Sequence, residues 1–167
     1  MILLIMGVTG SGKTTVGSEL AARLGWPFLD ADRFHSPENK AKMHRGVHLT
    51  EEDRGPWLQA IHAELVRMEK LKQNAVLGCS ALRKSYREIL AAGVDLRVAY
   101  LQGSYEVMQR RIEERREHFA GTSILEDQFA VLEEPEDALN LDVTLSAHAL
   151  VEQILTHYGL KPAARAD

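Results

Sequence analysis

A glycine-rich segment directly after an apolar run is the feature that most narrows the fold of this chain. Residues 2–6 are apolar without a break, which is typical of a strand covered on both faces of a sheet. Residues 7–14 read GVTGSGKT and fit the pattern G-x-x-x-x-G-K-T. Val16, Leu20 and Leu24 then recur every four residues, as on one face of a helix. This order predicts an α/β fold with a phosphate-binding turn.

The glycine-rich loop predicts a site for ATP and Mg²⁺. Glycine lets the backbone fold around a phosphate without side-chain clashes, and the N-terminus of the next helix adds positive potential. We expect Lys13 to act as a catalytic residue at the β- and γ-phosphates, and the Thr14 hydroxyl to bind Mg²⁺. A glycine-rich turn without a ligand is the alternative, which the complete motif disfavours. The predicted cofactor-binding residues of the loop are Gly7, Val8, Thr9, Gly10, Ser11, Gly12, Lys13, Thr14 and Thr15.

The rest of the chain alternates short apolar runs with helical periods. Four more strands are predicted at 27–29, 75–78, 96–101 and 139–143. Helices are expected between them, with starts marked by Ser36, Pro56, Ser104 and Ser146. This alternation predicts a three-layer sandwich, in which a five-stranded parallel sheet carries helices on both faces. We expect one domain over residues 1–160, and a disordered tail over 161–167, which lacks large apolar side chains.

Composition limits the classes of partner. The 167 residues carry a net charge of -4, without the basic surplus that is typical of nucleic-acid binding. The run at 2–6 is too short for a signal peptide or a membrane span. Cys79, the single cysteine, excludes an intramolecular disulfide and suits a reducing cytoplasm, and the seven histidines lack the spacing of a zinc site. We therefore expect a cytoplasmic protein that binds neither nucleic acid nor a membrane.

Further sequence features narrow the P-loop class to small kinases. A GTPase would carry D-x-x-G after its third strand and N-K-x-D for guanine, and the chain contains neither string. The third predicted strand ends in GCSAL, without a Walker B aspartate. We expect Cys79 there to be a small buried residue rather than a nucleophile, because phosphoryl transfer needs no covalent step. The alternative of another class is an ATP-binding regulatory module, which would need no carboxylate at position 32.

Two carboxylates follow the second predicted strand. Asp30 and Asp32 would point the same way on an extended segment. We expect Asp30 to help hold Mg²⁺, and Asp32 to accept the proton of an attacking hydroxyl as a catalytic residue. An Asx turn with solvated charges is the alternative. Because the carboxyl ends of parallel strands meet at one edge, this segment, Cys79-Ser80 and Gly103 are expected near the phosphate loop.

Two polar segments are candidates for the acceptor site. An insertion at about 33–55 is rich in histidine, lysine and arginine and contains Asn39, and a basic run occupies 83–87. Arginine binds a carboxylate through two parallel hydrogen bonds, whereas aspartate, histidine and asparagine bind hydroxyls. The mixture suits a polyhydroxylated anion. For each basic residue at 83–87, the start of a surface helix is an equal alternative.

An arginine-rich segment at about 110–125 is predicted to be a lid. We expect Arg111 and Arg115 to bind ATP, and Arg116 to act as a catalytic residue that neutralises charge on the transferred phosphoryl group. The alternative is a solvated helix face, because neighbouring glutamates can pair with these arginines.

Several specific motifs occur in a fixed order after the phosphate loop. They are D-x-D-x-x-H followed by K-M, then D-R-x-P-W-L, C-S-A-L and L-E-x-P, within DADRFHSPENKAKM, DRGPWL, CSALRKSYR and LEDQFAVLEEP. With them the chain resembles, over about residues 2–154, the gluconokinase family of small P-loop kinases. The resemblance implies a nucleoside-monophosphate-kinase-like fold with a lid, ATP-dependent phosphorylation of the 6-hydroxyl of D-gluconate, and a homodimer.

On the matching positions, the resemblance implies that Lys13 and Thr14 serve ATP and Mg²⁺. The candidates for binding gluconate are Asp32, His35, Lys42, Arg54, Arg83 and Arg87. Shikimate kinase also pairs a phosphate loop with D-x-D, but a G-G-G turn would be expected where Cys79-Ser80-Ala81 stands. A nucleotide kinase is a third option.

Overall fold

Five parallel strands form one sheet in the order β2-β3-β1-β4-β5, which confirms the predicted fold class. The computed structural model describes residues 1–114 and 121–163. Each strand lies within one residue of its predicted range. The strands are β1 (Ile2–Met6), β2 (Phe28–Asp30), β3 (Ala75–Gly78), β4 (Leu96–Gln102) and β5 (Leu139–Asp142).

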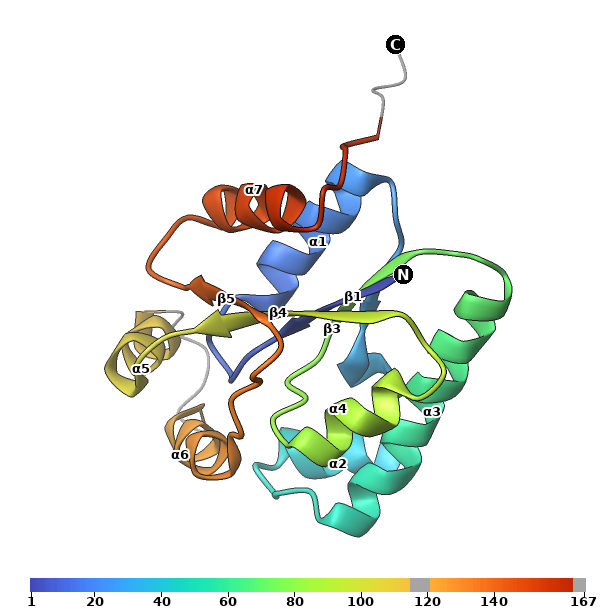
Figure 1. Ribbon diagram of the computed structural model, residues 1–167. Helices are drawn as coiled ribbons and strands as arrows, with labels where there is room; N and C mark the ends of the chain where they lie inside the picture. The colour runs from blue at the N-terminus through green and yellow to red at the C-terminus, as the bar shows by residue number, and fades with distance from the viewer. Residues whose placement is uncertain (115–120, 164–167) are drawn as a thin grey trace.

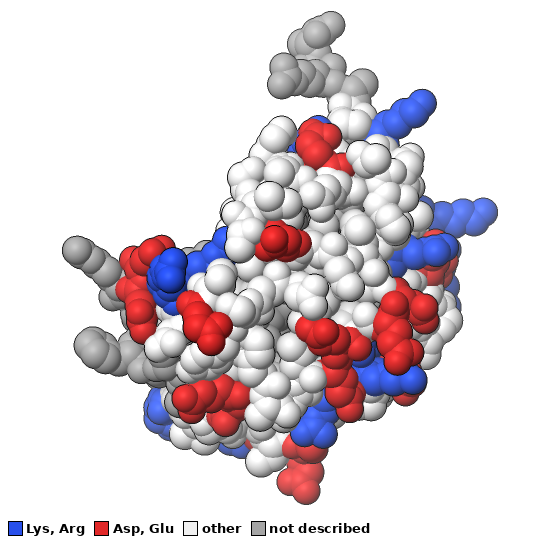
Figure 2. Space-filling model, turned by 60° about the vertical axis from the view of Figure 1, so that its left-hand side comes forward, with Lys and Arg blue, Asp and Glu red and all other residues white. Residues whose placement is uncertain are grey.

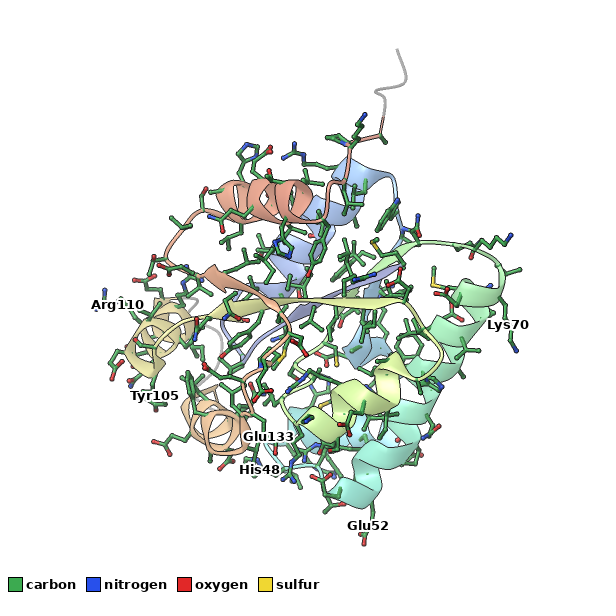
Figure 3. All side chains as sticks on the ribbon, in the orientation of Figure 1. His48, Glu52, Lys70, Tyr105, Arg110 and Glu133 are labelled. Atoms are coloured by element: carbon green, nitrogen blue, oxygen red, sulfur yellow. The ribbon has the colours of Figure 1, made fainter. Side chains whose placement is uncertain are left out.

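Helices cover both faces of this sheet. They are α1 (Lys13–Leu24), α2 (Pro37–His44), α3 (Glu51–Lys70), α4 (Lys84–Ala91), α5 (Tyr105–Glu114), α6 (Gly121–Val131) and α7 (Ala147–His157), with a short 3-10 helix, η1 (Ala31–Phe34), before α2. Helices α1 and α7 lie on one face, and α3 and α4 on the other (Figure 1). Glu52 and Lys70 mark the two ends of α3 in Figure 3. Among the helices that the structure describes, none is long and apolar enough to cross a membrane.

The side chains of β1 alternate between two cores. Leu3 and Ile5 pack beneath α1 and α7, whereas Ile2, Leu4 and Met6 pack beneath α3 and α4. All five are fully buried, and burial of one such side chain stabilises a fold by about 1.5–3 kcal/mol. Since β1 pairs with β3 on one side and β4 on the other, the loop after β1 leaves the middle of the sheet's carboxyl edge.

Helix α3 begins at Glu51, so the prediction that a helix opens at Pro56 is wrong. The Thr50 hydroxyl accepts a hydrogen bond from the Asp53 N–H (3.2 Å), and the Asp53 carboxylate accepts one from the Thr50 N–H (3.0 Å). This capping box satisfies N–H groups that the start of a helix leaves unpaired. Pro56 lies inside the helix, where it costs one backbone hydrogen bond.

The other predicted caps are confirmed. The hydroxyls of Ser36, Ser104 and Ser146 accept backbone N–H groups at the starts of α2, α5 and α7. At the end of the chain, the Ala163 N–H donates to the Arg23 carbonyl oxygen at the end of α1 (2.8 Å). The predicted tail, residues 161–167, is therefore hydrogen-bonded to the end of α1 through Ala163. Its residues 164–167 lie outside the described part of the chain.

The ring of Phe28 in β2 packs against two glycines. A Cβ built on Gly17 of α1 would lie 2.5 Å from Phe28 Cε2, and one built on Gly78 of β3 would lie 2.9 Å from Phe28 Cζ. Neither position has room for a side chain unless the ring moves. Glycine at both positions therefore sets how closely α1 and β3 approach β2.

We expect Gly17→Ala to lower the free energy of unfolding by about 1–3 kcal/mol, because the added methyl group meets the Phe28 ring. This loss should outweigh the helix propensity that alanine gains over glycine, about 1 kcal/mol. The control is Ala22→Gly at an exposed position of the same helix, which should lose about 0.5–1 kcal/mol because it changes helix propensity alone. Both variants are measured by urea denaturation followed by circular dichroism. A gain in stability for Gly17→Ala would contradict the close approach at Gly17.

Candidate active site

The phosphate loop, residues 7–12, joins β1 to α1 and is built to receive an anion. Gly10 and Gly12 have φ values of 78° and 100°, a left-handed region that favours glycine. Helix α1 has no side-chain cap and no acidic residue in its first turn, so its N–H groups and positive end face the loop. The Ser11 hydroxyl is buried and has no hydrogen-bond partner among the described residues. These groups fit a bound phosphate.

Two basic residues predicted to bind ATP lie at this loop. Lys13 Nζ donates to the Val8 carbonyl oxygen (2.9 Å). Arg111 of α5 donates to the carbonyl oxygens of Ser11 (3.5 Å) and Val143, and so joins the phosphate loop to the segment after β5. Arg115 and Arg116, the other two predicted arginines of the lid, lie outside the described residues.

The structure separates the two carboxylates that follow β2. The expected extended segment is wrong, because residues 31–34 form η1. Asp30 caps this turn: its Oδ1 accepts the Asp32 N–H (3.0 Å), as the Asx-turn alternative describes. Asp32 lines a cavity of about 430 Å³ beside the phosphate loop, whereas Asp30 does not. The two side chains are therefore not an aligned pair.

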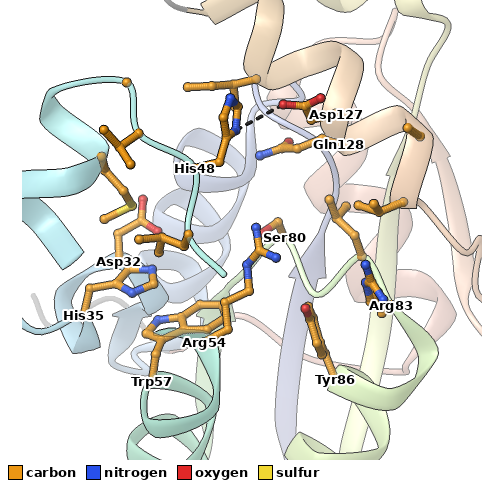
Figure 4. A pocket seen from close by; sticks show the side chains of 18 residues that line it. Asp32, His35, His48, Arg54, Trp57, Ser80, Arg83, Tyr86, Asp127 and Gln128 are labelled. Carbon is orange, nitrogen blue, oxygen red and sulfur yellow. Dashed lines mark ion pairs between the residues drawn. The ribbon is translucent and has the colours of Figure 1, made fainter. Parts of the chain in front are cut away.

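Three segments surround this cavity, the acceptor cavity. They are the insertion between β2 and α3, the loop between β3 and α4, and helix α6. Figure 4 shows Asp32 and His35 on one side, Arg83 and Tyr86 on the other, and the Arg54 guanidinium between them. The structure thus brings together Asp32, His35, Arg54 and Arg83 of the residues predicted to bind the acceptor.

Glu51, a carboxylate not predicted from the sequence, contacts both arginines of the cavity. It accepts hydrogen bonds from the Tyr86 hydroxyl (2.6 and 2.7 Å) and from Arg54 Nη1 (3.1 Å), and lies 3.6 Å from Arg83 Nη2. The Tyr86 hydrogen bond is the main cause that lowers the pKa of Glu51. Exposed ion pairs each contribute only about 0–1 kcal/mol to folding stability. The main effect of these contacts is therefore on the direction of the two guanidinium groups.

His35 is a buried, uncharged ring at the cavity. Only 7% of it is exposed, and it stacks on Trp57 with ring centroids 4.5 Å apart. Trp57 is itself fixed, since its Nε1 donates to the Ala31 carbonyl oxygen (2.8 Å). Burial lowers the pKa of His35 and outweighs the opposing effect of Asp32, so the ring is neutral at pH 7. His35 Nδ1 is buried and has no hydrogen-bond partner among the described residues.

Lys42 and Arg87, both predicted to bind the acceptor, are not among the residues that line the cavity. Lys42 Nζ binds both oxygens of the Asp53 carboxylate (2.8 and 2.9 Å), and so supports the capping box of α3. Arg87 donates to the carbonyl oxygens of Ala81 (3.0 Å) and Leu82 (3.2 Å) and holds the loop after β3. Arg87 thus holds Leu82, which lines the cavity, and Lys42 holds Asp53, the neighbour of the lining residue Arg54.

Helix α6 supplies five residues of the cavity lining that were not predicted from the sequence, and two of them, Asp127 and Gln128, are polar. Gln128 Oε1 accepts the N–H of Thr9 in the phosphate loop (2.6 Å). Asp127 lies 3.1 Å from His48 Nδ1, and so ties α6 to the insertion after α2 (Figure 4). The string LEDQF contains both residues, but nothing local in it indicates what either side chain contacts.

The surface outside the cavity carries both signs of charge. On the face shown in Figure 2, acidic and basic side chains are interspersed, without a broad basic patch. This distribution agrees with the net charge of -4 and offers no extended track for a polyanion on that face.

Comparison with known proteins places the chain among small-molecule kinases. A family model described as shikimate kinase matches residues 9–154. The gluconokinase of Gluconobacter oxydans is 41% identical, over 93% of this chain and 90% of that protein. The crystal structure of a gluconokinase from Sinorhizobium meliloti superposes with a TM-score of 0.84 at 37% identity, over 94% of this chain and 90% of that one. A sugar kinase from Janibacter sp. HTCC2649 has a TM-score of 0.89 at 38% identity, over 99% and 98%.

Cys79 lies next to the site but is not part of its surface, as expected. It is 2% exposed, and burial raises the pKa of its thiol from 9.0 to about 12. A buried thiol with a raised pKa is almost entirely protonated at pH 7, so Cys79 is a poor nucleophile in the folded protein. We expect a thiol-reactive disulfide reagent to modify Cys79 in guanidinium-unfolded protein and to leave the folded protein unmodified over the same time. Rapid reaction of the folded protein would contradict the burial.

Proposed function

Because the chain belongs to the gluconokinase family, we propose that it transfers the γ-phosphoryl group of ATP to the 6-hydroxyl of D-gluconate, an activity of gluconate catabolism. The observation that carries this proposal is the adjacency of two sites. The phosphate loop, at the uncapped start of α1, is joined by Gln128 to a cavity whose lining includes the guanidiniums of Arg54 and Arg83, the neutral imidazole of His35 and the carboxylate of Asp32. A polyhydroxylated carboxylate matches that set of groups.

The cavity suggests how the acceptor is oriented. Arg54 and Arg83, both held by Glu51, suit the carboxylate of gluconate. Asp32 and His35 lie across the cavity from Arg83 and suit the hydroxyls at the other end of an extended sugar acid (Figure 4). In this arrangement Asp32 accepts the proton of the 6-hydroxyl as that oxygen attacks the γ-phosphorus.

The phosphate loop supplies the nucleotide side. We propose that Lys13 and the loop N–H groups bind the β- and γ-phosphates, and that Arg111 binds ATP from α5. We propose that Thr14 and Asp30 bind Mg²⁺. The bound ion would neutralise negative charge on the β- and γ-phosphates. Roles for Arg115 and Arg116 in the lid, a homodimer and a cytoplasmic location stay predictions from the sequence.

An acceptor panel tests the substrate. ADP release in a coupled assay, with ATP and Mg²⁺, should be fast with D-gluconate and slow with shikimate, with sugar acids of other stereochemistry and with nucleoside monophosphates. The reason is that a good substrate must place its carboxylate on Arg54 and Arg83 and, at the same time, its hydroxyls on Asp32 and His35. Faster turnover of shikimate or of a nucleotide than of gluconate would overturn the assignment. ATP binding without turnover of any acceptor would favour a regulatory module.

We expect Asp32→Asn to lower kcat by about 10²–10⁴-fold, because the amide cannot accept the proton of the attacking hydroxyl. Affinity for ATP should stay within about twofold, since the phosphate loop is untouched. Glu52→Gln, the same change of acid to amide at the exposed start of α3, serves as the control and should keep its activity. Undiminished turnover by Asp32→Asn would exclude Asp32 as the base.

A further inference from the structure

Gln128 of α6 contacts the phosphate loop and lines the acceptor cavity. Its Oε1 accepts the N–H of Thr9 at 2.6 Å, across 119 positions of sequence. The same side chain borders the cavity that contains Asp32 and Arg54. Gln128 therefore lies where the nucleotide side and the acceptor side of the proposed site meet.

The contact with Thr9 fixes which end of the amide faces the cavity. A backbone N–H can only donate, so the amide oxygen must face the loop and the NH₂ group must face away from it. In Figure 4 the nitrogen end of Gln128 points toward the open middle of the cavity. Within residues 1–114 and 121–163, no protein group accepts a hydrogen bond from this nitrogen. Two N–H donors are thus aimed into the space beside the phosphate loop.

Helix α6 is held in place on both sides of the cavity. Gln128 joins it to the phosphate loop, and the neighbouring Asp127 pairs with His48 of the insertion (3.1 Å). The His48–Asp127 pair is exposed and stabilises little by itself. The pair shows that α6 and the insertion lie side by side, and the contact with Thr9 sets the direction of the Gln128 amide.

We propose that Gln128 is a catalytic residue whose Nε2 donates a hydrogen bond to an oxygen of the terminal phosphoryl group, while Oε1 stays on the Thr9 N–H. In the transfer, the bond from the γ-phosphorus to the ADP oxygen breaks, a bond to the acceptor oxygen forms, and the acceptor proton passes to Asp32. Negative charge on the phosphoryl oxygens is stabilised by fixed donors in such a step. The role of Gln128 rests on the proposed phosphoryl transfer but not on the identity of the acceptor.

Gln128→Glu separates the two ends of the amide. A carboxylate can still accept the Thr9 N–H, but an anionic oxygen replaces the donor that faces the phosphoryl group. We expect kcat to fall by about 10²-fold or more, the size of effect seen when one fixed donor is removed. Isothermal titration calorimetry, done without an acceptor, should show weaker binding of a non-hydrolysable ATP analogue and binding of ADP within about twofold of the parent protein.

Gln128→Leu, a second variant, removes both the amide oxygen that accepts the Thr9 N–H and the nitrogen that donates into the cavity. Its affinity for the ATP analogue should fall more than its affinity for ADP. The affinity for ADP should also fall somewhat, because the Thr9 N–H loses its partner. The control is Glu126→Gln on the same helix, an exposed position outside the residues that line the cavity, which should leave kcat and both affinities unchanged. Thermal unfolding of each variant verifies that it is folded.

Three results would overturn the proposal. Full kcat in Gln128→Glu would show that no donor is needed. Equal losses for ADP and the ATP analogue in both variants would show that Gln128 only supports the loop. Tighter binding of the ATP analogue by Gln128→Leu would show that the side chain occupies a phosphate position and must leave. The nucleotide titrations need no acceptor, so they stay informative even if the acceptor panel contradicts gluconate.

Discussion

The burial of β1 on both faces is the constraint on which the site depends. Its five side chains fill two separate cores, and it pairs with β4 along its whole length and with β3 over residues 2–5. Neither a shift in register nor a rotation of this strand is possible without exposing apolar surface. The phosphate loop therefore leaves a rigid point at the centre of the carboxyl edge. The loops after β2 and β3 leave the same edge, which is how Asp32 and the segment before α4 come to lie beside the loop.

Most of the fold could be predicted from the sequence because its signals are local. Short apolar runs mark β1 and β3, a mostly apolar run that includes Arg97 marks β4, and serine caps mark the starts of α2, α5 and α7. The start of α3 shows the limit of this approach. Pro56 is a valid start signal by itself, but Thr50 and Asp53 form a reciprocal cap upstream, and Lys42 from α2 supports it. The hydrogen bonds of Thr50, Asp53 and Lys42 therefore outweigh the start signal of Pro56, and the helix begins at Glu51.

Dense motifs in the sequence indicate which segments form the candidate site. They do not indicate what each side chain in those segments contacts. The phosphate loop, Asp32, His35, Arg54 and Arg83 could be predicted because each belongs to a dense motif, and the structure places the last four at one cavity. Lys42 and Arg87 belong to the same motifs, yet they bind Asp53 and the carbonyl oxygens of the β3–α4 loop. Glu51 and Gln128 were missed because their partners are remote: Tyr86 lies 35 positions from Glu51, and Thr9 lies 119 positions from Gln128. Sequence spacing carries no information about such contacts.

These supporting contacts explain how a chain with a net charge of -4 can present a site for two anions. Arg54 and Arg83 share one carboxylate, Glu51, so their positive charge is only partly neutralised while their directions are fixed. Lys42 is paired with Asp53 and takes no part in the cavity. The acidic residues are thus used to orient some cations and to occupy others. The charge available to a ligand is therefore set by which pairs form, and the overall composition says little about it.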